Sequence, residues 1–162
     1  MFLMGCGGDQ NPLPRRSVEL ARQYGSDLAA AVEAVLTGPT QPIGPTLTTA
    51  YAEIPLAFGT LPSRSQLEQD AASTNAPLAA RGRSLLAQLD AGEPLPTSYP
   101  YPVTLWRLGN GVQWWFLGGE LVVDYALRIK AELAPAADHA SPVWVTAYAQ
   151  DVMAYIPSRR VL

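Results

Sequence analysis

Hydrophobic residues recur along this chain with two periods, and the two periods separate predicted helices from predicted strands. Steps of three and four residues place apolar side chains on one face of a helix. This spacing occurs over residues 18–35, 76–89 and from Glu120 to about Leu133. Alternating or continuous apolar residues, which indicate strands, occupy residues 2–4, 47–58, 101–108, 112–117 and 143–149.

Start and stop signals define several of these boundaries. Ser17 is predicted to cap the first helix, and Gly38-Pro39 ends that helix. Ser63 and Gln66 have the spacing of a capping box, which predicts a further helix from residue 63. Pro55 lacks a backbone N–H, so the strand that contains it is expected at a sheet edge or at a bulge.

The predicted order is strand, helix, strand, two helices, hairpin, helix and strand. This order is typical of an α/β protein with a mixed sheet and flanking helices, and an α+β arrangement stays open. The chain has 162 residues, of which 15% are charged and 48% hydrophobic. It is therefore neither a disordered tail nor a coiled coil, and one domain over residues 1–162 is expected.

Charge and residue counts exclude several classes of function. The formal net charge is −3 and the chain has no basic block, so nucleic acid is not expected as a partner. No apolar run reaches the roughly 20 residues of a transmembrane helix. A soluble chain is therefore expected, while the compartment, including export of a longer parent protein, stays open. Cys6 is the only cysteine and His139 the only histidine, which excludes an internal disulfide and a multi-histidine metal site within the chain.

Two glycine-containing stretches are candidates for a functional site. Residues 5–12 read G-C-G-G-D-Q-N-P, and such glycines can bring backbone N–H groups close to a ligand. Gly118-Gly119 follows the predicted strand at 112–117, and Glu120 comes next. Glu120 is either a ligand-binding carboxylate or an ordinary acid in the first turn of a helix, where the helix dipole favours it.

Three segments, taken in order, carry a resemblance to a known family. They read F-L-M-G-C-G-G-D-Q-N-P at residues 2–12, L-G-G-E-L-V-V-D-Y-A-L-R at 117–128 and A-Q-D-V-M-A-Y-I-P-S-R-R at 149–160. Together they resemble the catalytic domain of the neutral/alkaline (non-lysosomal) ceramidases, especially its distant bacterial relatives. The resemblance covers nearly the whole chain. It implies a zinc amidohydrolase that splits N-acyl sphingosine into a fatty acid and a sphingoid base.

The resemblance assigns roles to individual positions. Glu120 looks like the family's carboxylate zinc ligand, and Tyr155 looks like the tyrosine near or on the same zinc. Asp9 belongs to the Gly-Asp step before the family's active-site serine, and Asn11 stands at the position of that serine. An amide has no hydroxyl to deprotonate, so Asn11 cannot act as an alkoxide nucleophile. The family's two zinc-binding histidines have no counterpart here, because His139 matches neither.

The resemblance also implies that the chain is the C-terminal part of a longer catalytic domain, beginning inside a strand and ending just past Tyr155. Zinc and a lipid-like or other amide substrate are expected in the full-length parent, and no tight zinc binding is expected of this chain. A zinc hydroxide can attack an amide without a serine. Asn11 therefore leaves open whether the parent hydrolyses another substrate or is inactive. The alternative is a non-catalytic α/β binding or structural module that retains the ceramidase-like scaffold.

Several of these residues have structural interpretations as well. Tyr155 is alternatively a core tyrosine, and Asp9 and Asn11 are common turn formers. Arg159 and Arg160 are expected to be a solvated pair, with an anion-holding pair as the alternative. The four tryptophans are expected to pack in the core and on the sheet, with lipid contact as the alternative. The single cysteine is expected to be a buried structural thiol.

Overall fold

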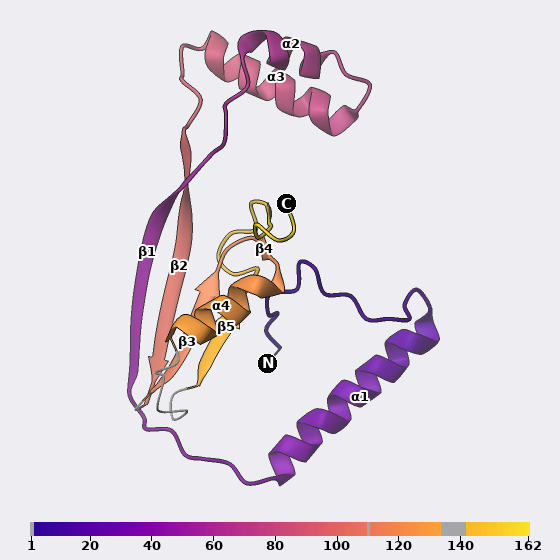
Figure 1. Ribbon diagram of the computed structural model, residues 1–162, viewed down its shortest axis with the longest axis vertical. Coiled ribbons are helices and arrows are strands. Elements are labelled where there is room, and N and C mark those ends of the chain that lie inside the picture. The colour runs from indigo at the N-terminus through magenta and orange to yellow at the C-terminus, as the bar shows by residue number, and fades with distance from the viewer. Residues whose placement is uncertain (1, 110, 134–141) are drawn as a thin grey trace. The chain divides into compact units, whose positions relative to one another are not determined.

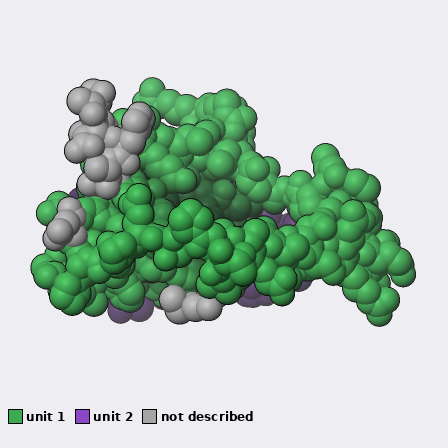
Figure 2. Space-filling view, turned by 90° about the horizontal axis from the view of Figure 1, so that it is seen from below, with its two compact units in different colours: residues 1–52, 102–162 green, residues 53–101 purple. Residues whose placement is uncertain are grey.

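The computed structural model describes residues 2–109, 111–133 and 142–162 (Figure 1). Contacts group the chain into two compact units, residues 1–52 with 102–162 and residues 53–101, which Figure 2 colours separately. The expectation of a single domain stays a prediction, and each unit is described by itself. The fold is mixed α/β, as the order of predicted elements indicated.

Ten helices and strands are defined among the described residues. Figure 1 labels most of these elements, which are α1 (Val18–Thr37), β1 (Leu47–Ala57), α2 (Arg64–Ala71), α3 (Ala76–Asp90), β2 (Ser98–Leu108), β3 (Val112–Leu117), β4 (Glu120–Leu121), α4 (Val123–Leu133), β5 (Val143–Thr146) and β6 (Tyr155–Ile156). Both predicted serine caps are confirmed, because Ser17 accepts from the Leu20 N–H and Ser63 accepts from the Gln66 N–H. No helix in the described part of the chain is both long and apolar enough to cross a bilayer.

Four strands form one sheet in the order β1-β2-β3-β5. β2 and β3 form the predicted antiparallel hairpin, with Trp106 opposite Trp114. β3 and β5 are parallel, with Trp114 opposite Trp144, and a parallel pair needs a crossover connection, which here contains β4 and α4. The three rings lie on one face, with centroids 6.2 Å and 5.1 Å apart. These contacts confirm that the three tryptophans pack on the sheet.

A second, two-stranded parallel sheet pairs β4 with β6 and corrects one prediction. Glu120 does not lie in the first turn of a helix, because α4 begins only at Val123. The Glu120 N–H donates instead to the Ala154 carbonyl at 2.8 Å. Pairing with a segment far along the chain has overridden the local helical pattern.

Two further strand predictions need correction. Residues 2–4 are not a strand, although the Met4 carbonyl accepts from the Ala147 N–H at 3.0 Å. The strand predicted to Ala149 ends at Thr146, because Tyr148 has a φ of 56°, which is incompatible with extended backbone. The turn residue Asn110 and the predicted loop at 136–141 with His139 lie outside the described residues.

The largest fully buried side chains of the first unit lie in and directly after the short β4 strand. Leu121 and Val122 are 1% and 0% exposed and directly follow Glu120, so the backbone on this side of Glu120 is firmly anchored. The same core includes Cys6, Val112, Phe116, Leu117, Val143 and Ala147. The prediction of a buried cysteine is confirmed. By contrast, all of β1 is exposed and α1 has no buried residue. The apolar face of α1 therefore packs against no core in the described part of the chain.

The second unit contains the helical hairpin of α2 and α3. Leu67 of α2 is fully buried, and the buried residues of α3 are Ala79 and Gly82. The leucines that give residues 76–89 their helical spacing, Leu78, Leu85, Leu86 and Leu89, are only half-buried. Small residues at the contact let the two helices approach closely, which a pattern of large apolar residues does not reveal.

Candidate functional site

The three segments that carry the family resemblance lie side by side in the first unit. The Gly8 N–H donates to the Leu121 carbonyl at 2.8 Å, which joins the first segment to the second. The Glu120 N–H donates to the Ala154 carbonyl at 2.8 Å, which joins the second segment to the third. Segments far apart in the sequence thus surround Glu120.

Two of the glycines singled out from the sequence let these segments approach each other. A Cβ on Gly8 would lie 2.9 Å from the carbonyl oxygens of both Glu120 and Leu121, closer than real Cβ atoms come. Gly119 has a φ of 77°, which disfavours any side chain, and its Cβ would meet Ile156 at 2.7 Å. The sequence predicts that glycines here let the backbone approach a ligand. At these two positions they instead let neighbouring segments of the protein pack closely.

Glu120 and Tyr155 are direct partners in the β4–β6 pair. Directly opposed residues of neighbouring strands project to the same side of a sheet, so the two predicted zinc ligands are adjacent on one face. Glu120 is half-buried, and Tyr155 is 43% exposed. The strand register therefore brings together the two residues that the resemblance assigned to one metal.

Tyr148 is a site residue that no motif in the sequence indicates. Its hydroxyl donates to Glu120 Oε1 at 3.2 Å. Partial burial, followed by the Glu120 charge, raises the pKa of Tyr148, so the phenol stays a protonated donor at neutral pH. The position of a Cβ on Gly7 lies 3.8 Å from the same hydroxyl, which places the glycine-rich loop beside it. The alternating pattern at 143–149 marked Tyr148 only as a strand residue.

Asp9 holds the glycine-rich loop against the start of α4. Its Oδ1 accepts from the Val123 N–H at 2.8 Å, and its Oδ2 pairs with Arg160 Nη2 at 3.1 Å. The Val123 N–H lowers the pKa of Asp9, with smaller contributions that include Gln10 and Arg160. Asp9 thus caps a helix that lies more than a hundred residues further along the chain. Both carboxylate oxygens have a structural partner.

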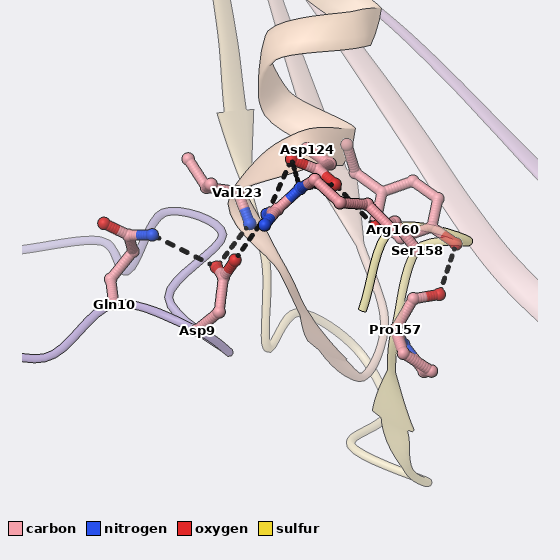
Figure 3. A network of polar contacts seen from close by, with 8 residues as sticks. Asp9, Gln10, Val123, Asp124, Pro157, Ser158 and Arg160 are labelled. Atoms are coloured by element: carbon pink, nitrogen blue, oxygen red, sulfur yellow. Dashed lines mark hydrogen bonds and ion pairs between the residues drawn. The ribbon is translucent and has the colours of Figure 1, made fainter. Parts of the chain in front are cut away.

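Asp9, Asp124, Ser158 and Arg160 form a polar network that we call the Arg160 clasp (Figure 3). Arg160 Nε donates to Asp124 Oδ2 at 2.9 Å, and Arg160 Nη2 donates to Asp124 Oδ1 at 3.0 Å. The Ser158 hydroxyl donates to Asp124 Oδ2 at 2.5 Å. Bonds from Arg160, and then from Ser158, lower the pKa of Asp124. The clasp fastens the C-terminal segment and the glycine-rich loop to the same helix terminus.

Asn11, which stands at the family's serine position, is exposed. Its side-chain oxygen accepts from Arg15 Nη1 at 2.7 Å, a contact within the same loop. The catalytic roles that the resemblance assigned to Asp9 and Asn11 stay predictions.

The described residues do not fit a complete zinc site. Residues 2–109, 111–133 and 142–162 contain no group of three or more histidine, cysteine, aspartate or glutamate side chains that could hold a metal ion. Catalytic zinc usually has about three protein ligands, histidine nitrogen among them. Glu120 and Tyr155 supply only two ligand residues, both through oxygen, and Tyr148 already binds one carboxylate oxygen of Glu120.

Two pockets differ in their relation to this site. One of about 410 Å³ lies beside the Arg160 clasp and is lined by Asp124, Tyr125, Arg128, Ser158, Arg159 and Arg160. Another of about 680 Å³ belongs to the second unit, between residues 58 and 81, and contains none of the predicted site residues.

Comparisons of the chain with models of protein families, with curated proteins and with solved structures found no match. The ceramidase-like roles of Glu120 and Tyr155 therefore stay predictions that rest on the resemblance.

Proposed function

We propose that this chain is part of a zinc-dependent amide-hydrolase site resembling that of the neutral ceramidases. The observation that supports the proposal is the convergence of the three resembling segments on Glu120. The register of β4 and β6 puts Tyr155 beside Glu120, and Gly8 contacts the same strand. The proposal requires these three segments to meet at the residue that carries the predicted chemistry, and they do so.

In this proposal the residues of the chain position an amide substrate. Tyr148 fixes Oε1 of Glu120 and leaves Oε2 to face a ligand. The Tyr155 hydroxyl, on the same face, can donate to the oxygen that becomes negative when an amide is attacked. Zinc belongs to the proposal only for the full-length parent, because the ion needs ligands beyond those of the described residues.

A second candidate is a non-catalytic α/β binding or structural module that retains the ceramidase-like scaffold. Asn11 favours this candidate, because it lacks a hydroxyl and its amide oxygen is bound by Arg15. The gene offers a direct discriminator. A coding segment upstream with a G-x-H-x-H-type histidine motif would favour the hydrolase, and its absence would favour the module.

The decisive experiment assays the longest protein that the gene encodes, with N-acyl sphingosine and with a simple N-acyl amide. We expect fatty acid release that Glu120→Gln lowers by about 100-fold or more, because the carboxylate acts at the reaction centre. Glu132→Gln is the matched control, since Glu132 is an exposed acid of α4. Release that is absent from the unmodified protein, or equal in the two variants, would reject the hydrolase in favour of the module.

A further inference from the structure

The pocket beside the Arg160 clasp has an unusual lining. Three of its six lining residues are arginines and only one, Asp124, is acidic. The arginines come from two parts of the chain, Arg128 from α4 and Arg159 and Arg160 from the C-terminal segment (Figure 3 shows Arg160). Its volume of about 410 Å³ is in the range of small-molecule sites.

Each guanidinium group has N–H donors that no described group accepts. Arg160 is held in place through Nε and Nη2 by Asp124 and Asp9, which leaves its Nη1 without a partner among the described residues. Arg128 pairs through Nε with Glu132 and lies over the Tyr125 ring, with its Cζ 5.7 Å from the ring centroid.

Arg159 is the third donor of the pocket. Within the described ranges it has neither an ion pair nor a hydrogen bond, although it lines the pocket. A guanidinium without a structural partner is available for a ligand, and one that is already fixed, such as Arg160, loses little freedom when it binds. The pocket thus combines a free donor with a preorganised one.

The charges around the pocket restrict the kind of ligand. Asp9, Asp124 and Glu132 pair with Arg160 and Arg128, so these three acids balance the charge of the three arginines. Because the pocket has no excess positive charge, it attracts a ligand through hydrogen bonds from its N–H groups more than through long-range electrostatic attraction. Such a pocket favours a monoanion over a dianion. The planar fork of a guanidinium matches a carboxylate.

We propose that this pocket binds an organic carboxylate. The carboxylate lies between Arg159 and Nη1 of Arg160, and the apolar part of the ligand lies on the Tyr125 ring and the aliphatic stem of Arg128. This site is distinct from the Glu120 carboxylate and does not depend on hydrolysis.

The test is a titration of the ¹⁵N-labelled chain with hexanoate, followed by the amide NMR signals of residues 124–128 and 158–160. We expect saturable shifts of these signals, with a dissociation constant on the order of 1 mM for so small a ligand. Arg159→Gln should weaken binding at least about fivefold, since it removes a charge-assisted bond. Arg22→Gln, the same change at an exposed position of α1, should leave binding unchanged.

Two further probes test the ligand class. Hexanol has the same apolar chain without the charge and should give no saturable shift, and inorganic phosphate should bind more weakly than hexanoate. Because no structural bond depends on Arg159, its variant should keep the unliganded spectrum outside the pocket. Shifts that stay linear, that persist equally in Arg159→Gln and Arg22→Gln, or that are stronger with phosphate would overturn the proposal.

Discussion

Three of the six described residues with a positive φ lie in the chain segments next to Glu120. Tyr148 and Gln150 both have a φ of 56°, and Gly119 has a φ of 77°. For residues with a side chain this conformation costs about 1–2 kcal/mol. Tyr148 is held by its N–H bond to the Gly119 carbonyl and its hydroxyl bond to Glu120. Strain that is retained by such contacts is common at functional sites.

Gly8→Ala tests the close approach of the loop to β4. The added methyl group would meet two carbonyl oxygens at 2.9 Å, so backbone has to move. We expect a loss of about 1–3 kcal/mol in the free energy of unfolding, measured by urea denaturation and tryptophan fluorescence. Gly5→Ala is the control in the same loop, because its Cβ would be 4.0 Å from the nearest atom, the Val145 carbonyl oxygen. Equal values in both variants would show that the close approach of Gly8 to β4 does not constrain the loop.

Zinc binding tests the ligand set at Glu120 and Tyr155. Two oxygen ligands without histidine nitrogen hold zinc poorly, so we expect the 162-residue chain to bind zinc weakly or not at all. Isothermal titration calorimetry measures this directly, with zinc titrated into EDTA as a check on the metal solution. A single tight, stoichiometric site would contradict the expectation and would require further ligands from this chain.

Sequence motifs predict some residues of the site, whereas others have no recognisable local signal. Glu120 and Tyr155 stand in recognisable motifs, and the structure makes them neighbours. Tyr148 was missed, because its positive φ leaves no trace in an alternating pattern. The role of Asp9 as a helix cap was also missed, since capping signals are sought within a few residues of a helix and this cap comes from the other end of the chain.

At the scale of elements, the N-terminus of α4 is bonded to both the glycine-rich loop and the C-terminal segment. Its first N–H, that of Val123, donates to Asp9, and its Asp124 binds Arg160 and Ser158. Acids near a helix N-terminus interact favourably with its dipole. The clasp therefore joins the loop, the helix and the C-terminal segment through two carboxylates, those of Asp9 and Asp124, whose charge depends on pH.

The pH dependence of stability tests the clasp. The pKa of Asp124 is lowered in the folded protein, first by Arg160. Its stabilising effect is therefore present above the unfolded-state pKa of about 3.9 and is lost as the pH falls through the lower folded value. We expect the unfolding free energy of Asp124→Asn to fall below that of the unmodified chain near neutral pH, with the difference shrinking below about pH 4.

Chemical denaturation at a series of pH values measures this difference. Asp27→Asn, an exposed position of α1, is the control for the change of charge. A difference between Asp124→Asn and the unmodified chain that stays constant down to about pH 3 would mean that the charge of Asp124 does not stabilise the fold.

Local signals predicted the longer elements well. The caps of α1 and α2 and the β2–β3 hairpin follow from nearby residues. The two-residue strands β4 and β6 could not be predicted, because only pairing across the chain makes them strands. The local pattern predicts Glu120 at the start of a helix because the residues after it have helical spacing. Only the pairing with β6 makes it a strand residue.

At the scale of the whole molecule, the predicted site belongs to one of the two compact units. Glu120, Tyr148, Tyr155 and the glycine-rich loop all lie in the unit of residues 1–52 and 102–162. The unit of residues 53–101 contributes none of the predicted site residues. The hydrolase proposal is therefore a statement about the first unit alone.

The activity of the chain by itself is a separate prediction. We expect no measurable ceramide hydrolysis, and we expect Asn11→Ser not to create it. A nucleophile, a metal and substrate positioning act as a unit, so restoring one part leaves the rate unchanged. A fluorescent ceramide assay measures this, with Asn11→Ser in a Glu120→Ala background as the control. Turnover in Asn11→Ser that is lost in the double variant would overturn the expectation.

The parallel alignment of β4 with β6 makes the length of the segment between β5 and β6 critical. Successive side chains of a strand point to opposite faces, so a slip by one residue would set Ala154 or Ile156 against Glu120 and turn Tyr155 to the other side. Surface connections usually tolerate insertions and deletions. Here one residue more or fewer between Ala147 and Tyr155 would separate the carboxylate from the phenol. Related chains that keep this site should therefore keep the length of that connection even where its sequence varies.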